Sequence, residues 1–244
     1  MINYNKRHDF NNRQYGGCQS LFSAGSFLKD KVYLYKIFIQ IKGLNIADNA
    51  KIKILDVGCS HGSFARFLKD QGFDVYGIDI SRRAAAKALE FGIKAIQCDV
   101  EQRIDFSDNY FDIVIAAEII EHLYDTDYFL QEITRVAKDN GYLFLSTPNL
   151  ASLKNRIRLL AGKYPRHSEY RLGPGLSGHI RNYTVSALKL QIKENNWRII
   201  KITSPNFLCP MTKNIPIFIK KIAMFLGDIF YTLGSHIIIT AKKI

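Results

Sequence analysis

Short β-rich runs alternate with helix-compatible segments from Lys51 onward, and this alternation restricts the fold more than any other feature of the sequence. Two of the runs, IKILDV and FDIVIAA, are almost continuously apolar. Strands that alternate with helices form βαβ units, and strands that are buried on both faces read as continuous apolar runs. The chain is therefore expected to be α/β, with a doubly wound parallel sheet. Strands are expected over residues 52–57, 74–78, 94–98, 111–116 and 142–146, and helices over residues 62–71, 82–91 and 126–136.

The segments around this core differ from it in composition. Residues 1–50 are expected to form a helical cap over the carboxyl edge of the sheet, with a helix within 27–44, and residues 51–244 to form the main domain. Residues 148–184 begin with a basic amphipathic helix over 153–160 and continue as a loop rich in Gly, Pro and Arg. An irregular segment of this length is usually a functional lid. The remaining expected elements are a helix over 185–195 and strands over 197–204 and 235–241.

An apolar insertion, residues 205–234, precedes the last strand. Its stretch IPIFIKKIAMFLGDIFYTL places Lys220, Lys221, Asp228 and Thr232 on one helical stripe. No apolar run in it reaches the roughly 18–20 residues that a transmembrane helix needs. We expect either a pair of helices that covers the core or an element that lies at a membrane interface.

The basic excess of the chain is confined to its C-terminal part. Residues 1–150 contain 18 Lys and Arg against 19 Asp and Glu, whereas residues 151–244 contain 16 against 3. The positive electrostatic potential of such a basic segment favours an acidic partner: a phosphate-bearing substrate, an anionic membrane surface or nucleic acid. The alternative is a basic surface that serves solubility alone.

Two signals bear on the cellular compartment. The first residues, MINYNKRHDF, lack the apolar segment of a secretory signal, so a cytoplasmic location is expected. The four cysteines have neither the spacing of a zinc site nor that of a short disulfide framework, and reduced thiols are expected. They are Cys18, Cys59, Cys98 and Cys209.

The run ILDVGCSHG, residues 54–62, has the features of a cofactor-binding turn. Gly58 and Gly62 permit a tight turn from strand to helix and let a ligand approach the backbone. A dinucleotide fingerprint would read G-x-G-x-x-G, which this spacing does not match. Asp56 suits a cofactor that presents an ammonium group or a positive sulfur. Asp79 ends the second strand, where a carboxylate binds ribose hydroxyls, and Asp99 follows the third strand, close to where an adenine amino group would lie.

These motifs, together with GIDIS, CDV and FDIVIAAEIIEHL, resemble the class I S-adenosylmethionine-dependent methyltransferases over roughly residues 50–150. The resemblance implies a Rossmann-like sheet of seven strands whose last strand runs antiparallel, and SHIIITA fits that strand. It also implies that Asp56 lines the methionine end of S-adenosyl-L-methionine, Asp79 the ribose and Asp99 the adenine. Ser60 replaces the family's common third glycine, which puts one backbone contact in doubt. The candidate cofactor-binding residues are Asp56, Gly58, Ser60, Gly62, Asp79, Ile80, Asp99, Val100 and Ala117.

The stretch AAEIIEHL follows the fourth strand and places Glu118, Glu121 and His122 where the methyl group should be delivered. On a helix these side chains would project from one face. Two carboxylates and an imidazole can hold a divalent cation such as Mg²⁺, or His122 can act alone as a base. Either role suits an oxygen nucleophile, because a phenol with a pKa of about 10 is mostly protonated at neutral pH.

A second resemblance involves EIIEHL, FLSTPN and GHIRNYTVSAL, which look like segments of the ubiquinone-pathway O-methyltransferases. In that family an E-x-x-E-H group is a divalent-metal site and a histidine-bearing segment follows the fifth strand. The small-RNA 2′-O-methyltransferases use a similar group with a further histidine, and His179 is the candidate for that position. Similar enzymes of glycan and lipid-precursor synthesis often need no metal. The candidate catalytic residues are His122, Glu121 and His179, and the candidate metal ligands are Glu118, Glu121 and His122.

The basic segment 154–171 suggests an acceptor or a surface that carries phosphate. With the apolar insertion, it favours a lipid-linked acceptor at a membrane, such as a quinone precursor or a glycan intermediate. RNA is a rival acceptor, since Tyr164, Tyr170 and Tyr183 could stack on bases, but no appended RNA-binding module is recognisable. A subunit that binds the cofactor without transferring methyl is a further alternative. A nicotinamide oxidoreductase is disfavoured by the glycine spacing.

Overall fold

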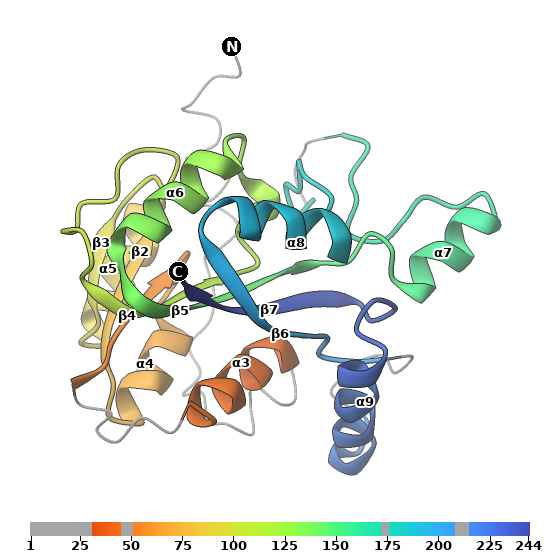
Figure 1. The fold of residues 1–244 in the computed structure, drawn as a ribbon, viewed down its shortest axis with the longest axis horizontal. Coiled ribbons are helices and arrows are strands. Elements are labelled where there is room, and N and C mark those ends of the chain that lie inside the picture. The colour runs from red at the N-terminus through yellow and green to blue at the C-terminus, as the bar shows by residue number, and fades with distance from the viewer. Residues whose placement is uncertain (1–30, 45–50, 172–175, 208–214) are drawn as a thin grey trace.

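The computed structural model describes residues 31–44, 51–171, 176–207 and 215–244. A seven-stranded sheet in the order β3-β2-β1-β4-β5-β7-β6 forms its centre (Figure 1). The strands are β1 (Lys53–Val57), β2 (Asp74–Asp79), β3 (Lys94–Gln97), β4 (Phe111–Ala117), β5 (Ala137–Pro148), β6 (Trp197–Thr203) and β7 (His236–Lys243). Strands β1 to β5 pair in parallel, and β7 runs antiparallel to both β5 and β6. The predicted doubly wound sheet with an antiparallel last strand is confirmed.

Helices cover both faces of the sheet. One face carries α3 (Val32–Lys42), α4 (Ser63–Asp70) and α5 (Arg82–Glu90), and the other carries α6 (Thr126–Val136) and α8 (Val185–Glu194). A 3-10 helix, η2 (Ile120–His122), follows β4. Helices α7 (Leu153–Leu160) and α9 (Ile217–Ile229) project from the body of the molecule (Figure 1). None of the helices in the described ranges is long and apolar enough to cross a membrane.

Strand β4 explains the continuously apolar runs of the sequence. Ile113 and Ile115 pack in the cluster that includes α3 and α4, whereas Val114 and Ala116 pack in the cluster that includes α6 and α8. All four side chains are fully buried. Full burial of a branched aliphatic side chain contributes about 1.5–3 kcal/mol, so both faces of the strand must be apolar.

Capping side chains set several of the helix boundaries that the sequence predicts. Ser81, Asp125 and Thr184 each accept a hydrogen bond from the backbone N–H three residues further on, at the starts of α5, α6 and α8. Strand β5 differs from expectation because it begins at Ala137 instead of residue 142. Ala137 pairs with Phe111 before a register shift in the ladder, and this irregular pairing leaves no signal in the sequence.

Helix α3 is the described part of the predicted N-terminal cap. Its side chains Leu34, Ile37 and Ile41 pack on a face of the sheet, in the cluster with α4, and not over the carboxyl edge. Only its first turn approaches that edge, where Tyr33 stacks on His236 with ring centroids 6.0 Å apart. Residues 1–30 and 45–50 lie outside the described residues, so the cap as a separate unit stays a prediction.

The insertion before β7 contains one described helix, α9, and residues 208–214 lie outside the described residues. The expected alternative of a helix pair with its apolar side on the core does not fit α9, because its apolar side is exposed. Cys59 and Cys98 are free thiols, as expected, whereas Cys18 and Cys209 lie outside the described residues.

Candidate active site

The carboxyl ends of the parallel strands and the start of β7 meet at one edge of the sheet. His236, the first residue of β7, pairs with Pro148, the last residue of β5, because the two strands are antiparallel. The strand order reverses between β1 and β4. In open α/β sheets, ligands bind in the crevice at such a reversal. The candidate site therefore lies at the carboxyl ends of β1 and β4.

The turn after β1 needs glycine at two positions. Gly58 and Gly62 have φ angles of 71° and 74°, in the left-handed region. A Cβ atom would lie 2.8 Å from Cδ1 of Ile119 at Gly58, and 2.8 Å from Cβ of Ala88 at Gly62. Both positions therefore combine a left-handed backbone with a close approach, as the predicted tight turn requires.

Ser60 lies in the same turn with a φ angle of 51°. Its backbone N–H donates a hydrogen bond of 2.8 Å to Oδ2 of Asp79. This N–H therefore holds a carboxylate of the chain itself. The role of Ser60 in cofactor binding stays a prediction.

Asp79, at the end of β2, is held between two backbone donors. Its Oδ1 accepts from the N–H of Ser81 at 2.8 Å, and its Oδ2 accepts from Ser60. Burial raises the pKa of Asp79, and the two hydrogen bonds oppose that rise. Each carboxylate oxygen has a second lone pair, so this fixed carboxylate can still accept hydrogen bonds from a ligand.

Asp56 is the most perturbed carboxyl group of the cofactor end. It is 4% exposed, and burial, followed by the charge of Asp79, raises its pKa to about 7. A cation beside a buried carboxyl group lowers its raised pKa and so favours the ionised carboxylate. An ammonium group of a ligand would supply that cation.

The remaining predicted cofactor residues lie at or just after the carboxyl ends of β2, β3 and β4. Asp99 follows β3, and its Oδ1 accepts from the N–H of Glu101 at 3.0 Å. Val100 is buried beside the core cluster of Ile104. Ile80 follows β2 and accepts through its carbonyl oxygen from Gln97 at 3.3 Å. Ala117 ends β4 and is half-buried.

Glu118 does not share a helical face with Glu121 and His122, contrary to expectation. Its φ angle of 57° separates β4 from the 3-10 helix Ile120–His122, which Glu118 precedes. The Glu118 carboxylate accepts from the hydroxyl of Ser146 at 2.7 Å. Burial raises the pKa of Glu118 to about 7, although the Ser146 hydrogen bond opposes the shift. The left-handed residue turns this side chain towards β5.

Glu121 is 1% exposed, and its two carboxylate oxygens differ. Oε2 accepts from the hydroxyl of Thr147 at 3.0 Å, whereas Oε1 is buried without a hydrogen-bond partner. Burial, and then the charge of Glu118, raises the pKa of Glu121 well above its usual range. A buried polar atom without a partner is uncommon and costs about 1–3 kcal/mol. Such an atom fits a site that is completed by a ligand.

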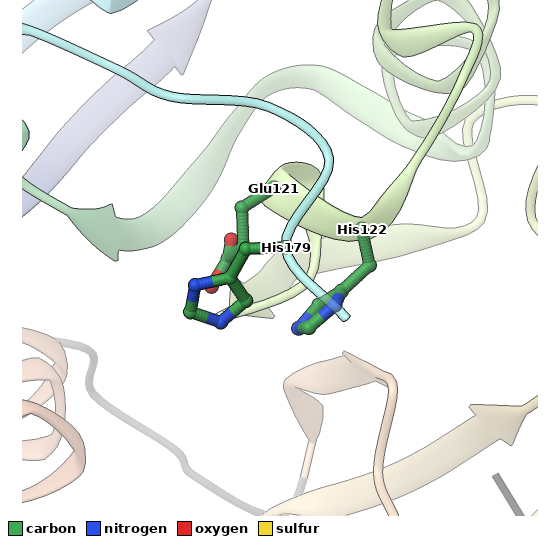
Figure 2. Close-up of side chains that lie close together, drawn as sticks. All are labelled: Glu121, His122 and His179. Carbon is green, nitrogen blue, oxygen red and sulfur yellow. The ribbon is translucent and has the colours of Figure 1, made fainter. Parts of the chain in front are cut away.

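His122 and His179 lie beside Glu121, and each of the three side chains offers one ligand atom within 4.8 Å of the other two (Figure 2). Nδ1 of His122 lies 3.1 Å from the carbonyl oxygen of Gly178, and Nδ1 of His179 lies 2.7 Å from that of His167. A carbonyl oxygen only accepts, so each Nδ1 carries a proton, and in the neutral imidazole Nε2 is then the nitrogen with the free lone pair. Metal-binding histidines are commonly oriented in this way.

The structure thus brings Glu121 and His122 together with His179, and places Glu118 outside this group. The backbone turn at Glu118 directs its carboxylate to Ser146 instead, and the metal set of Glu118, Glu121 and His122 stays a prediction. The predicted catalytic residues, His122, Glu121 and His179, are the three that cluster.

Sequence reasoning missed two further histidines at this edge. Nε2 of His236 lies 3.4 Å from Oε2 of Glu118, and the ring of His167 lies 5.5 Å from that of His236. Burial, and then the charge of His179, lowers the pKa of His236 to about 4, so its contact with Glu118 is not an ion pair at neutral pH. A signal for His236 was present: the first residue of an antiparallel last strand must lie beside the end of β5.

The predicted lid, residues 148–184, is fastened to the site at its C-terminal end. The carbonyl oxygen of Glu121 accepts from the N–H groups of Ile180 and Arg181 at 2.9 and 3.0 Å. The Glu169 carboxylate accepts from the N–H groups of Gly178 and His179. These contacts place His179 beside Glu121. Residues 172–175 of the segment lie outside the described residues.

A family model described as a methyltransferase domain matches residues 37–202. A ubiquinone biosynthesis O-methyltransferase of Pelagibacter ubique (strain HTCC1062) is 25% identical over 184 residues, which cover 67% of this chain and 75% of the relative. A ubiquinone biosynthesis O-methyltransferase of Rickettsia conorii (strain ATCC VR-613 / Malish 7) is 35% identical over 123 residues, which cover 48% of this chain and 42% of the relative. The match thus spans less than half of the second relative's length.

A crystal structure of a SAM-dependent methyltransferase from Thermotoga maritima, described as a possible histamine N-methyltransferase, has a similar fold. The TM-score is 0.62 at 17% sequence identity, over 89% of this chain and 92% of that chain. Identity at this level supports the shared fold and leaves the acceptor open.

Proposed function

Because the chain belongs to the class I S-adenosylmethionine-dependent methyltransferases, we propose that it methylates a hydroxyl oxygen of a small or lipid-linked acceptor. Methyl transfer from S-adenosyl-L-methionine is the activity of the family. The choice of oxygen rests on one observation, the cluster of Glu121, His122 and His179 with a buried, unpartnered carboxylate oxygen. The relatives named as O-methyltransferases support the same choice.

The proposed reaction is a direct displacement at the methyl carbon. The acceptor oxygen forms a bond to this carbon while the carbon–sulfur bond breaks, and sulfur keeps the electron pair. Orientation of the two reactants supplies much of the acceleration. The hydroxyl proton must also leave, and a positive charge or a base beside the oxygen favours its loss.

The cofactor is proposed to lie across the carboxyl ends of β1, β2 and β3. Asp56 would bind the ammonium group, which would restore its ionised form. Asp79 would accept from the ribose hydroxyls, since its backbone contacts hold it in place. Asp99 and Val100 would lie beside the adenine. The close backbone at Gly58 and Gly62 would let the methionine end approach the turn.

The cluster fits a divalent cation, which would be held by Glu121, His122 and His179. When bound, such an ion would supply positive charge that lowers the pKa of the acceptor hydroxyl. Thr147 orients the Glu121 carboxylate, and the carbonyl oxygens of Gly178 and His167 orient the two imidazoles. Carboxylates suit Mg²⁺ and Mn²⁺, whereas imidazoles suit Zn²⁺ and other borderline ions, so Mg²⁺ is one candidate among several.

The acceptor is proposed to be lipid-linked and to carry phosphate, as in a quinone precursor or a glycan intermediate at an anionic membrane surface. The lid exposes the basic side chains that would contact it: Lys154, Arg156, Lys163, Arg166 and Arg171. Guanidinium groups bind phosphate in a bidentate manner. A cytoplasmic enzyme that lies peripherally at the inner face of the membrane would meet such an acceptor.

The rival acceptor, RNA, is less well supported. Tyr183 is buried and its hydroxyl contacts Gln191, so it cannot stack on a base. Tyr164 and Tyr170 pack edge to face against each other, with ring centroids 5.9 Å apart. A subunit that only binds the cofactor would have no use for the buried, unpartnered carboxylate oxygen of Glu121.

Calorimetric titration of S-adenosyl-L-methionine and S-adenosylhomocysteine, with NAD as the control, tests the cofactor. Asp79→Ala should abolish micromolar binding. Methyl transfer to a panel of phenolic lipids, catechols and short RNAs, with and without chelator, then tests the acceptor. Transfer to none of them by a protein that binds the cofactor would favour the subunit that only binds it.

A further inference from the structure

Helix α9 presents an apolar face to solvent. Phe218, Ile222, Phe225 and Ile229 recur at the spacing of one helical stripe, and Phe218 and Phe225 are each 64% exposed. A surface helix ordinarily turns such a stripe towards the core. Contiguous apolar patches at a protein surface mark interaction sites.

The opposite face of α9 fixes this orientation. Its buried residues are Lys220, Ala223 and Gly227. A Cβ atom at Gly227 would lie 2.5 Å from the carbonyl oxygen of Ser204, so the helix backbone packs directly on the segment that follows β6. The stripe of large apolar residues would not fit on this side. The side chains at the body of the protein are small or polar, and the large apolar ones point outward.

Helix α3 holds α9 in the same orientation. Nζ of Lys36 lies 2.6 Å from Oδ1 of Asp228, and donates hydrogen bonds to the carbonyl oxygens of Ser204 and Met224 at 2.6 and 2.9 Å. Lys36 is buried, so breaking its ion pair by rotating α9 would leave a charge without its partner. The outward apolar stripe is therefore a stable feature of the fold.

The charge of the part of the chain that contains α9 points to the kind of partner. Residues 151–244 contain 16 Lys and Arg against 3 Asp and Glu, and one of these acids, Asp228, pairs with Lys36. Helix α7 is joined to the end of the α9 segment, because the N–H of Leu153 donates to the carbonyl oxygen of Leu233 at 2.9 Å. It exposes Ile157 and Leu160 together with basic side chains. An exposed apolar helix face in a strongly basic part of the chain is complementary to an anionic bilayer interface.

We propose that the exposed stripe of α9 inserts into the interface of a bilayer that contains anionic lipids. Six residues, 230–235, separate the end of α9 from His236 at the candidate site. Insertion would therefore hold the active-site edge close to the membrane. The idea that the membrane presents a lipid-linked acceptor to the site rests on the proposed function. The binding of α9 to a bilayer does not depend on it.

Sedimentation with vesicles tests the surface directly. The full chain should bind vesicles that contain phosphatidylglycerol and show little binding to pure phosphatidylcholine. The double variant Phe218→Ser, Phe225→Ser should bind at least tenfold more weakly. Leu190→Ser is the matched control, because Leu190 is 60% exposed on α8, away from the stripe, and this variant should bind as the wild type does.

Fluorescence provides a second measurement, in which the expected result is a gain of quenching and not a loss of vesicle binding. Trp197, the one tryptophan of the chain, is fully buried, so brominated lipids should not quench the wild type. The indole introduced by Phe225→Trp should be quenched on vesicles with phosphatidylglycerol. The same substitution at Leu190 should leave the emission unquenched.

Three results would overturn the proposal: no binding to anionic vesicles, binding that the α9 substitutions leave unchanged, or a dimer in solution that these substitutions dissociate. In the last case a second copy of the chain covers the stripe. Titration of S-adenosyl-L-methionine and transfer to a water-soluble phenol, both without vesicles, report on the proposed function separately. The α9 variants should leave both unchanged, and failure of transfer by the wild type would not affect vesicle binding.

Discussion

The hydroxyl of Thr147 donates to Oε2 of Glu121 at 3.0 Å and leaves Oε1 of the same carboxylate buried without a partner. The chain thus keeps a costly group at the position where a cation would offset the cost. Glu121→Gln should lower the affinity for Mn²⁺ at least tenfold by calorimetry, because a ligand charge is lost. The same change should maintain or raise the melting temperature without metal, since a neutral amide is easier to bury. Unchanged metal affinity would remove Glu121 from the site.

Two sets of metal ligands can be told apart by mutation: Glu121, His122 and His179, or Glu118, Glu121 and His122. His179→Ala should weaken Mn²⁺ binding about as much as Glu121→Gln, because the loss of one of three ligands is large. Glu118→Gln should weaken it less than either of these changes, because Glu118 contacts Ser146 and lies outside the cluster, so only the influence of its charge on Glu121 is lost. Electron paramagnetic resonance of bound Mn²⁺ measures both. The reverse order of effects would restore the set Glu118, Glu121 and His122.

Much of the sheet could be predicted because its signals are local. Strands such as β4 are buried on both faces and read as continuous apolar runs, and helices such as α5 begin at capping residues such as Ser81. The positions of Asp56, Asp79 and Asp99 could also be predicted, because each lies close to the carboxyl end of a predicted strand. Each of these features is set by a few neighbouring residues.

The rest depends on contacts between distant segments. Glu118 leaves the predicted helical face because of its left-handed backbone, a conformation that few non-glycine residues adopt. His236 joins the site only through the antiparallel register of β7, and His179 through the attachment of the lid to Glu121. The outward apolar face of α9 depends on Gly227 and on Lys36 of another helix. The position of His236 could have been inferred from the predicted antiparallel last strand, whereas no local pattern contains the other relationships.

The turn after β1 allows the cost of a left-handed backbone to be separated from the cost of a close approach. Gly62→Ala would place Cβ 2.8 Å from Cβ of Ala88, whereas Gly162, with a φ angle of 65°, has no atom within 4 Å of such a Cβ. Gly162→Ala should therefore cost only the backbone term, about 1–2 kcal/mol. Gly62→Ala should cost more in chemical denaturation, and Ala88→Gly should recover part of the difference. Equal costs at the two sites would mean that α5 moves aside freely.

Asp56 should make cofactor affinity and apo stability depend on pH in opposite directions. Its pKa of about 7 in the folded chain lies above the usual value of 3.8, so the folded state holds more protons than the unfolded state between these values. The contribution of Asp56 to stability is therefore lost as the pH rises through this window, by a few kcal/mol in order of magnitude. Binding of an ammonium group needs the ionised carboxylate, so affinity for S-adenosyl-L-methionine should rise between pH 6 and 8, a range set by a pKa of about 7.

Asp56→Asn provides the control for this effect, since the amide does not titrate. Denaturant titrations from pH 4 to 7 should show a smaller loss of stability for this variant than for the wild type, and calorimetry should show weak cofactor binding that no longer strengthens with pH. Other groups that titrate in this range, such as Glu118, contribute equally to both proteins, so the difference between the two profiles isolates Asp56. Parallel profiles would mean that Asp56 is ionised in the apo chain and that its burial does not govern cofactor binding.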